Sequence, residues 1–96
     1  MASINLIPRK EFEITLGDGS VIKGQFGTWA LRRYCDKMGY TLKTAGEHLG
    51  DPGIGDILEY ILAAVEYKAR QTGAPFSFTD VHVGSWIDEL GGITGG

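Results

Sequence analysis

Several features that would point to a catalytic or metal-binding protein are scarce in this sequence. Cysteine occurs once, as Cys35, which excludes an intrachain disulfide framework and suits a reducing cytoplasm. The only histidines are His48 and His82, and no cysteine or histidine pair has the spacing of metal ligands. Asp51 and Asp56 could hold a cation together with backbone carbonyls, but the stretch GDPGIGD does not match an EF-hand loop. We therefore expect no metal and no other cofactor.

The candidate nucleophiles lack the neighbours that activation requires. Ser20, Ser77 and Ser85 lie outside a nucleophile-elbow motif and have no recognisable base partner. Cys35 falls on the apolar face of a predicted helix, where a thiol is usually buried and inert. The glycines of residues 50–55 do not form the phosphate-binding pattern G-x-x-x-x-G-K-[ST]. The sequence thus favours a protein that is not an enzyme.

Charge and hydropathy exclude two further classes of partner. Nine lysines and arginines stand against twelve acidic residues, a net charge of −3 without the basic stripe that nucleic acid requires. The longest apolar region, residues 57–65, is interrupted by Glu59 and is too short to span a bilayer. The first residues show no apolar run of signal-peptide length. With 43% hydrophobic and 22% charged residues in 96 positions, we expect one cytosolic domain over residues 1–96.

The clearest local pattern lies near the start of the chain. From Phe12 to Leu16, apolar and polar residues alternate with the period of a half-buried strand. The following G-D-G-S stretch suits a hairpin turn, and a second amphipathic strand ends at Phe26. This pattern predicts an antiparallel hairpin over residues 11–26. Residues 1–9 lack any periodicity, so we expect a loose N-terminal arm there.

Helical patterns follow the hairpin. Thr28 is placed to cap a first helix, which Gly39 ends. Four glycines and Pro52 argue against an ordered helix between Tyr40 and Gly55, although TLKTAGEHL could form a short one, so a broken, mobile connection is expected there. Residues 56–72 carry a wide apolar stripe that predicts a long helix.

The last helical pattern begins after Thr79, which is placed to cap it. One face carries four apolar residues, Val83, Trp86, Ile87 and Leu90. Residues 92–96 have few side chains, so we expect a flexible glycine-rich tail. The whole order predicts an α+β fold, with an N-terminal antiparallel β-hairpin packed on a small bundle of about three to four helices.

More aromatic residues are present than so small a core is expected to bury. The set comprises Trp29, Tyr34, Tyr40, Tyr60, Tyr67, Phe76, Phe78 and Trp86. Partly exposed aromatic residues are common at protein interfaces. The alternative is that they line the edge of the core. A protein with surplus apolar surface is also expected to form homo-oligomers when no partner is present.

Three motifs of this chain, taken together, resemble the tail assembly chaperones of long-tailed bacteriophages and of related prophage or gene-transfer elements. They are the hairpin E-F-x-I-T-L-G-D-G, the following F-G-x-x-A-L-R, and the closing V-x-x-W-I-D-E-L-G-G. The resemblance covers residues 11–93 and depends on the combination, because no single motif is diagnostic. The glycine-rich residues 50–55 depart from the pattern, where a continuous acidic or leucine-rich segment is typical.

The resemblance implies a non-enzymatic function in the host cell cytoplasm. Such chaperones coat the tape-measure protein, keep it soluble and help recruit tail tube subunits, and they are absent from the mature virion. The expected partners are therefore the tape-measure protein and the tail tube protein. A structural tail or neck component of a phage-like particle is the alternative function, because it would share the size and the lack of catalytic groups.

The partner-binding residues are expected on the helix of residues 56–72. Tyr60 and Tyr67 are seven residues apart, so they lie on the same side of a helix and are the predicted outward anchors for an apolar helical segment of the partner. Trp29, Tyr40 and the loop of residues 50–55 are the other candidates.

Overall fold

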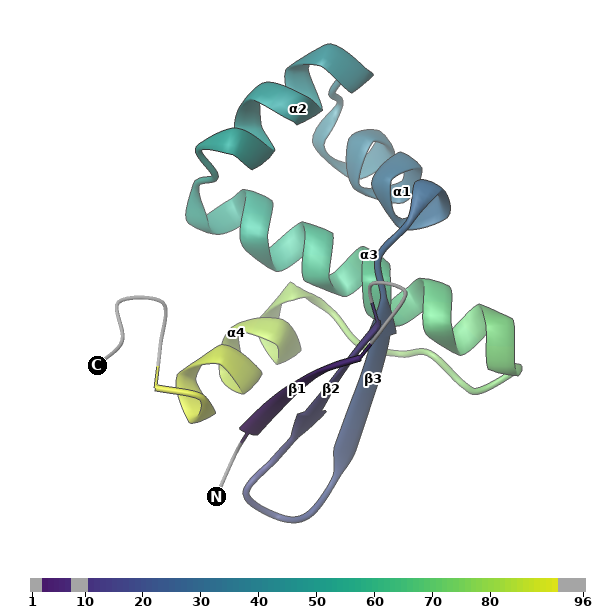
Figure 1. The fold of residues 1–96 in the computed structure, drawn as a ribbon, viewed down its shortest axis with the longest axis vertical. Helices are drawn as coiled ribbons and strands as arrows, with labels where there is room; N and C mark the ends of the chain where they lie inside the picture. Colours follow the sequence, from purple (N-terminus) through teal and green to yellow (C-terminus); the bar gives the residue numbers. More distant parts are fainter. Residues whose placement is uncertain (1–2, 8–10, 92–96) are drawn as a thin grey trace.

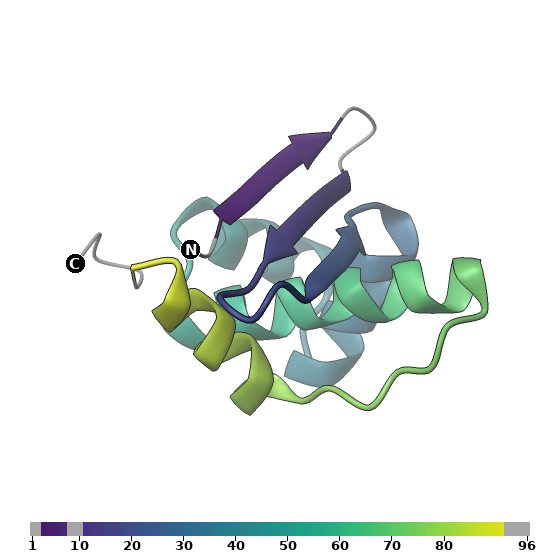
Figure 2. The same ribbon diagram turned by 90° about the horizontal axis from the view of Figure 1, so that it is seen from below.

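The computed structural model describes residues 3–7 and 11–91. Within them the chain forms three strands and four helices, in the order β1 (Ser3–Ile7), β2 (Glu11–Thr15), β3 (Val21–Gln25), α1 (Thr28–Met38), α2 (Leu42–Gly50), α3 (Ile54–Thr72) and α4 (Asp80–Glu89). The predicted α+β fold is confirmed, because an N-terminal antiparallel hairpin, β2–β3, packs against four helices (Figure 1). Figure 2 shows the three strands side by side in one sheet.

The two strands of the hairpin show the alternation that their sequence predicts. Phe12 lies opposite Gly24 and Ile14 lies opposite Ile22, and these four residues are buried. Gly24 has a specific role, since a Cβ atom at this position would lie 2.2 Å from the ring of Phe12. Only glycine leaves room for this aromatic ring to lie against β3.

The expected loose arm over residues 1–9 is wrong for the part that the structure describes. Ser3–Ile7 forms β1, which pairs antiparallel with β2, with Ile4 opposite Ile14 and Leu6 opposite Phe12. Polar and apolar residues alternate from Ser3 to Leu6, a short strand signal that the expectation of a loose arm does not take into account. Residues 1–2 and 8–10 lie outside the described residues. The expected flexible tail, residues 92–96, also lies outside them.

The middle of the chain corrects a second expectation. The predicted broken connection between Tyr40 and Gly55 contains the helix α2. Thr41 precedes it, and its hydroxyl oxygen accepts a hydrogen bond of 3.2 Å from the backbone N–H of Thr44, which caps the helix. Ala45 is fully buried against the rest of the protein, and this packing outweighs the low helix propensity of the glycines.

The boundaries of the other helices agree with the sequence to within two residues. Gly27, rather than Thr28, is the residue that precedes α1, and Gly39 ends it in the left-handed conformation at φ 72°. The helix α3 begins two residues before Asp56, whose carboxylate accepts a 2.9 Å hydrogen bond from the backbone N–H of Gly53. Gly73 ends α3, again with positive φ.

The core forms around α3, which packs against β3, α1 and α4 (Figure 1). The apolar face of α4 lies against the core: Val83 and Trp86 are buried, while Ile87 and Leu90 pack against the core from its edge. A 2.9 Å hydrogen bond from the backbone N–H of Gly17 to Glu89 Oε2 joins the hairpin turn to the end of α4. No helix among the described residues is long and apolar enough to cross a membrane.

Candidate partner-binding surfaces

The four aromatic residues proposed from the sequence do not lie together. Tyr60 packs against the edge of the core, with its ring centroid 4.9 Å from that of Phe26 and 5.3 Å from that of Tyr34. Burial raises the pKa of its phenol. The expectation that Tyr60 points outward is therefore wrong, because Phe26, directly after β3, and Tyr34 of α1 place their rings against this side of α3. Whether Tyr60 contributes to partner binding stays a prediction.

Tyr67 and Trp29 form a separate aromatic pair. Their rings are stacked, with centroids 5.5 Å apart and planes 18° from parallel. The guanidinium carbon of Arg70 lies 5.6 Å from the centroid of the Trp29 ring, within cation–π distance. Trp29 also lines a small cavity of about 110 Å³ with Arg32, Arg33 and Asp36 of α1. The pair thus sits beside a group of charged residues.

A buried carboxylate fixes the arginines next to this aromatic pair. Glu66 accepts a 3.0 Å hydrogen bond from Arg33 Nε of α1 and a 2.9 Å bond from Arg70 Nη2 of α3. Two cations therefore share one carboxylate, and the group links α1 to α3. Because both guanidinium groups already have an acidic partner, the cluster is explained by packing of the two helices.

The fourth candidate, Tyr40, belongs to a polar cluster around Asp56. The Asp56 carboxylate accepts a short 2.7 Å hydrogen bond from the Tyr34 hydroxyl and a longer 3.3 Å bond from the Tyr40 hydroxyl. His48 Nδ1 lies 3.3 Å from the same carboxylate, and the His48 ring stacks on the ring of Tyr40. Asp56 thus joins α1, α2 and α3 at one end of the helical layer.

The electrostatics of this cluster favour an ionised Asp56. The hydrogen bond from Tyr34 lowers the pKa of Asp56 more than burial raises it, and the Gly53 N–H and His48 lower it further. The pKa of Tyr34 is raised, first by burial and then by the neighbouring carboxylate. The carboxylate oxygens of Asp56 already accept hydrogen bonds from protein groups, so they are not free to bind a metal ion. Among residues 3–7 and 11–91, no group of three metal-ligating side chains lies close enough to hold an ion.

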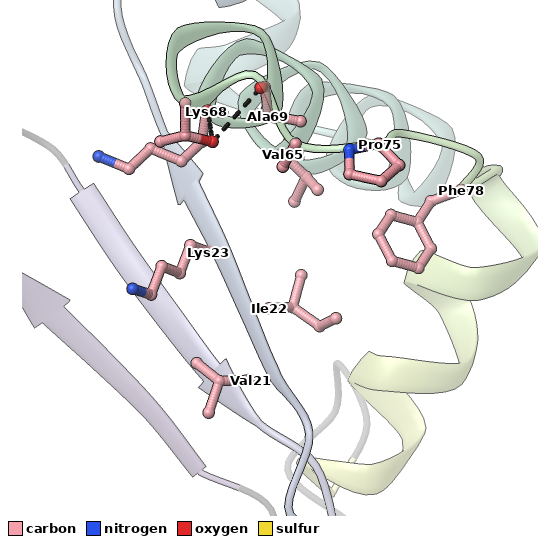
Figure 3. Close-up of a pocket in the computed structure, with 10 residues that line it drawn as sticks. Val21, Ile22, Lys23, Val65, Lys68, Ala69, Pro75 and Phe78 are labelled. Carbon is pink, nitrogen blue, oxygen red and sulfur yellow. Dashed lines mark hydrogen bonds between the residues drawn. The ribbon is translucent and has the colours of Figure 1, made fainter.

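A cavity along the sheet has no counterpart among the surfaces expected from the sequence. It has a volume of about 320 Å³ and lies between β3, the second half of α3 and the connection to α4 (Figure 3). Its lining consists of Val21, Ile22, Lys23, Val65, Lys68, Ala69, Thr72, Ala74, Pro75 and Phe78. We call this the β3 groove. No sequence signal identifies it, because it depends on which strand lies at the edge of the sheet.

Comparisons with known proteins provide no relative for this chain. No protein-family model, no curated protein and no solved structure matches it. The function is therefore proposed from the residues and the surfaces described above.

Proposed function

We propose that this protein is a non-enzymatic tail assembly chaperone of a long-tailed bacteriophage, or of a related prophage or gene-transfer element. In the host cytoplasm it binds the tape-measure protein, keeps that protein soluble and helps recruit tail tube subunits. The partners come from the resemblance of residues 11–93 to this family. The surface that would bind them comes from the structure.

The observation that carries the proposal is the β3 groove. A chaperone of this kind must mask apolar segments of a long partner chain, and such segments need an apolar surface that is open to solvent. Ala74, Pro75 and Phe78 line the groove with apolar side chains that are at least partly exposed, over the buried Ile22 and Val65. This surface is large enough for side chains of a polypeptide segment.

The positions of the three resembling motifs also support the proposal. The first forms β2 and its turn, the second forms the start of α1, and the third forms the end of α4. Gly17 of the first motif and Glu89 of the third are joined directly by a hydrogen bond, and Figure 2 shows the turn beside α4. The motifs therefore build one structural unit, which explains why they would occur together in a family.

Co-expression with the tape-measure protein of the same genome tests the proposal. We expect the two proteins to co-purify, and we expect the tape-measure protein to be insoluble when it is expressed alone. A tape-measure protein that remains soluble alone and does not co-purify would contradict the chaperone function.

The protein content of purified virions distinguishes a chaperone from the alternative, a structural tail or neck component. A chaperone is absent from finished particles, whereas a tail or neck component is present in a fixed number of copies. Mass spectrometry of purified particles is the measurement. Detection of this chain at the level of other tail proteins would assign it to the particle.

A further inference from the structure

The β3 strand has an unpaired edge within the part of the chain that the structure describes. The strand order is β1-β2-β3, so β3 pairs on one side with β2 and on its other side borders the groove. In an antiparallel ladder, alternate residues of an edge strand point their backbone N–H and C=O groups away from the neighbouring strand. About half of the backbone groups of β3 therefore face the groove, ready to bind another extended chain.

The groove gives such a chain an apolar side and a charged side. Ile22 and Val65 lie at the floor, and Phe78 closes one end (Figure 3). Lys23 and Lys68 extend their ammonium groups away from Phe78, toward the sheet. Lys68 pairs with Glu11 at 3.5 Å, whereas no carboxylate of residues 11–91 lies within ion-pair distance of Lys23.

We propose that the β3 groove binds an extended segment of the partner protein, which adds to the sheet as a fourth strand beside β3. The segment has the pattern apolar–acidic–apolar. Its apolar side chains pack on Pro75 and Phe78, over the buried Ile22 and Val65, and its acidic side chain lies opposite Lys23. This inference rests on the proposed function only for the identity of the partner.

Charge decides between an acidic partner and a second copy of this chain. Lys23 is the central residue of β3. If β3 of two copies paired antiparallel about a twofold axis at this residue, Lys23 would face Lys23, and like charges directly opposite destabilise a pair of strands. An acidic residue at that position has the opposite effect. In that register the unpaired lysine disfavours a second copy and favours an acidic segment of a different chain.

Strand addition also differs from the contact expected from the sequence. An apolar helix that docks on side chains leaves the backbone of β3 unbonded, whereas an added strand bonds to it. The exchange of backbone amide hydrogens distinguishes the two modes, because hydrogen-bonded amides exchange more slowly.

The test uses the full chain and the acetylated, amidated peptide Ser-Val-Glu-Val-Glu-Val-Ser as the probe. In an NMR titration we expect saturable shifts at residues 21–25, Val65, Ala69 and Phe78, and slower amide exchange in β3. The peptide Ser-Val-Lys-Val-Lys-Val-Ser is the charge control and should not bind. No saturable binding of the acidic peptide, shifts outside the groove, or unchanged exchange in β3 would overturn the proposal.

Two pairs of variants locate the binding. Lys23→Glu should weaken the acidic peptide roughly fivefold, because an attractive cross-strand pair becomes repulsive. Lys43→Glu, which changes an exposed lysine of α2, is its control and should bind as the wild type does. Ala69→Arg places a long side chain in the groove and should abolish binding, while Gln71→Arg changes an exposed residue of the same helix and should not. Equal losses within either pair would contradict a site in the groove.

The same variants separate this inference from the proposed function. If the wild type and Ala69→Arg both co-purify with the tape-measure protein, the chaperone function stands and the groove is not its binding site. If the wild type binds the acidic peptide in β3 but not the tape-measure protein, the groove stands and the proposed function falls. A wild-type dimer that Ala69→Arg converts to a monomer would assign the groove to a second copy and overturn the inference.

Discussion

Trp86 is the residue that holds α4 on the rest of the protein. Its side chain is only 5% exposed, and its ring packs edge-on against Phe78 at a centroid distance of 4.9 Å. Trp86→Ala should lower the free energy of unfolding by about 3–5 kcal/mol, because it removes a large buried ring and leaves a cavity. Urea denaturation measures this change.

Val81→Ala is the matched control on the same helix. Val81 is 75% exposed, so its truncation should change the free energy of unfolding by no more than about 0.5 kcal/mol. The urea midpoint of Trp86→Ala should lie well below that of the wild type, and the midpoint of Val81→Ala should not. If both variants have the wild-type midpoint, the ring of Trp86 does not hold α4 in place.

Asp56 should make the stability of the protein depend on pH. Its pKa is lowered in the folded state, mainly by the hydrogen bond from Tyr34, and an aspartate in the unfolded chain has a pKa of about 3.9. The folded state therefore binds a proton less readily, so its advantage is fully present above the unfolded pKa and is lost as pH falls through the folded pKa. Asp56→Asn should be less stable than the wild type at pH 7, and the difference should shrink in acid.

Denaturation at a series of pH values measures that difference. Asp51→Asn, at an exposed position nearby, should follow the wild-type profile. A constant difference between the wild type and Asp56→Asn from neutral to acidic pH would show that the ionised carboxylate contributes nothing.

The aromatic candidates show what helical periodicity can and cannot predict about single residues. The spacing of Tyr60 and Tyr67 correctly places them on one helix, α3. It does not say what lies against each ring, and the structure places Phe26 and Tyr34 on Tyr60 but Trp29 on Tyr67. These contacts depend on how α1 and β3 pack on α3, which no local pattern encodes.

At the scale of elements, β1 should contribute to stability although its polar–apolar alternation is only four residues long. It forms five residue pairs with β2, from Ser3 opposite Thr15 to Ile7 opposite Glu11. Deletion of residues 1–9 should lower the free energy of unfolding by about 1–5 kcal/mol, because cross-strand pairs contribute roughly 0.2–1 kcal/mol each. The deletion also leaves β2 at the edge of the sheet, which favours aggregation.

Urea denaturation and light scattering of the shortened chain test the role of β1. A loose arm, as expected from the sequence, would be removed without effect on either measurement. Unchanged stability and unchanged scattering would therefore contradict the strand pairing.

The elements that the sequence predicted well are those with strong local signals. The hairpin β2–β3 has clear alternation and a glycine-rich turn, and α3 and α4 have apolar stripes with terminal caps. The short helix that TLKTAGEHL could form, rather than the expected broken connection, is present as α2, because its stabilisation is tertiary. Ala45 is buried, and His48 reaches Asp56 of α3, while the local sequence contains glycines that disfavour a helix.

At the scale of the whole molecule, the β3 groove could not be predicted from the sequence, because it too depends on tertiary packing. It requires that β3, rather than β2, lies at the edge of the sheet, and that residues 73–79 pass beside it. Both facts follow from the arrangement of the elements in space. The lysines that give the groove its charge are 45 positions apart in the sequence, at Lys23 and Lys68, and no spacing rule connects them.

The formation of homo-oligomers, expected from the aromatic surplus, remains a prediction. The structure changes the surface that would form the contacts, from aromatic to aliphatic side chains. Most of those rings pack in or against the core, so exposed aliphatic side chains are the remaining candidates. Leu42, Ile54 and Val81 are 70%, 64% and 75% exposed, each in the first turn of a helix. Figure 1 shows that the starts of α2, α3 and α4 lie apart, so these contacts cannot close a single symmetric interface. The association should therefore be weak and open-ended.

Sedimentation velocity at increasing protein concentration tests this form of association. The mean sedimentation coefficient of the free protein should rise steadily without reaching the plateau of a dimer. Isolated exposed apolar side chains are common on soluble domains, so each contact is weak, and the combined change Leu42→Lys, Ile54→Lys and Val81→Lys should remove the rise. A monomer at every concentration would exclude self-association, and a plateau at the dimer would show one specific interface in place of several weak ones.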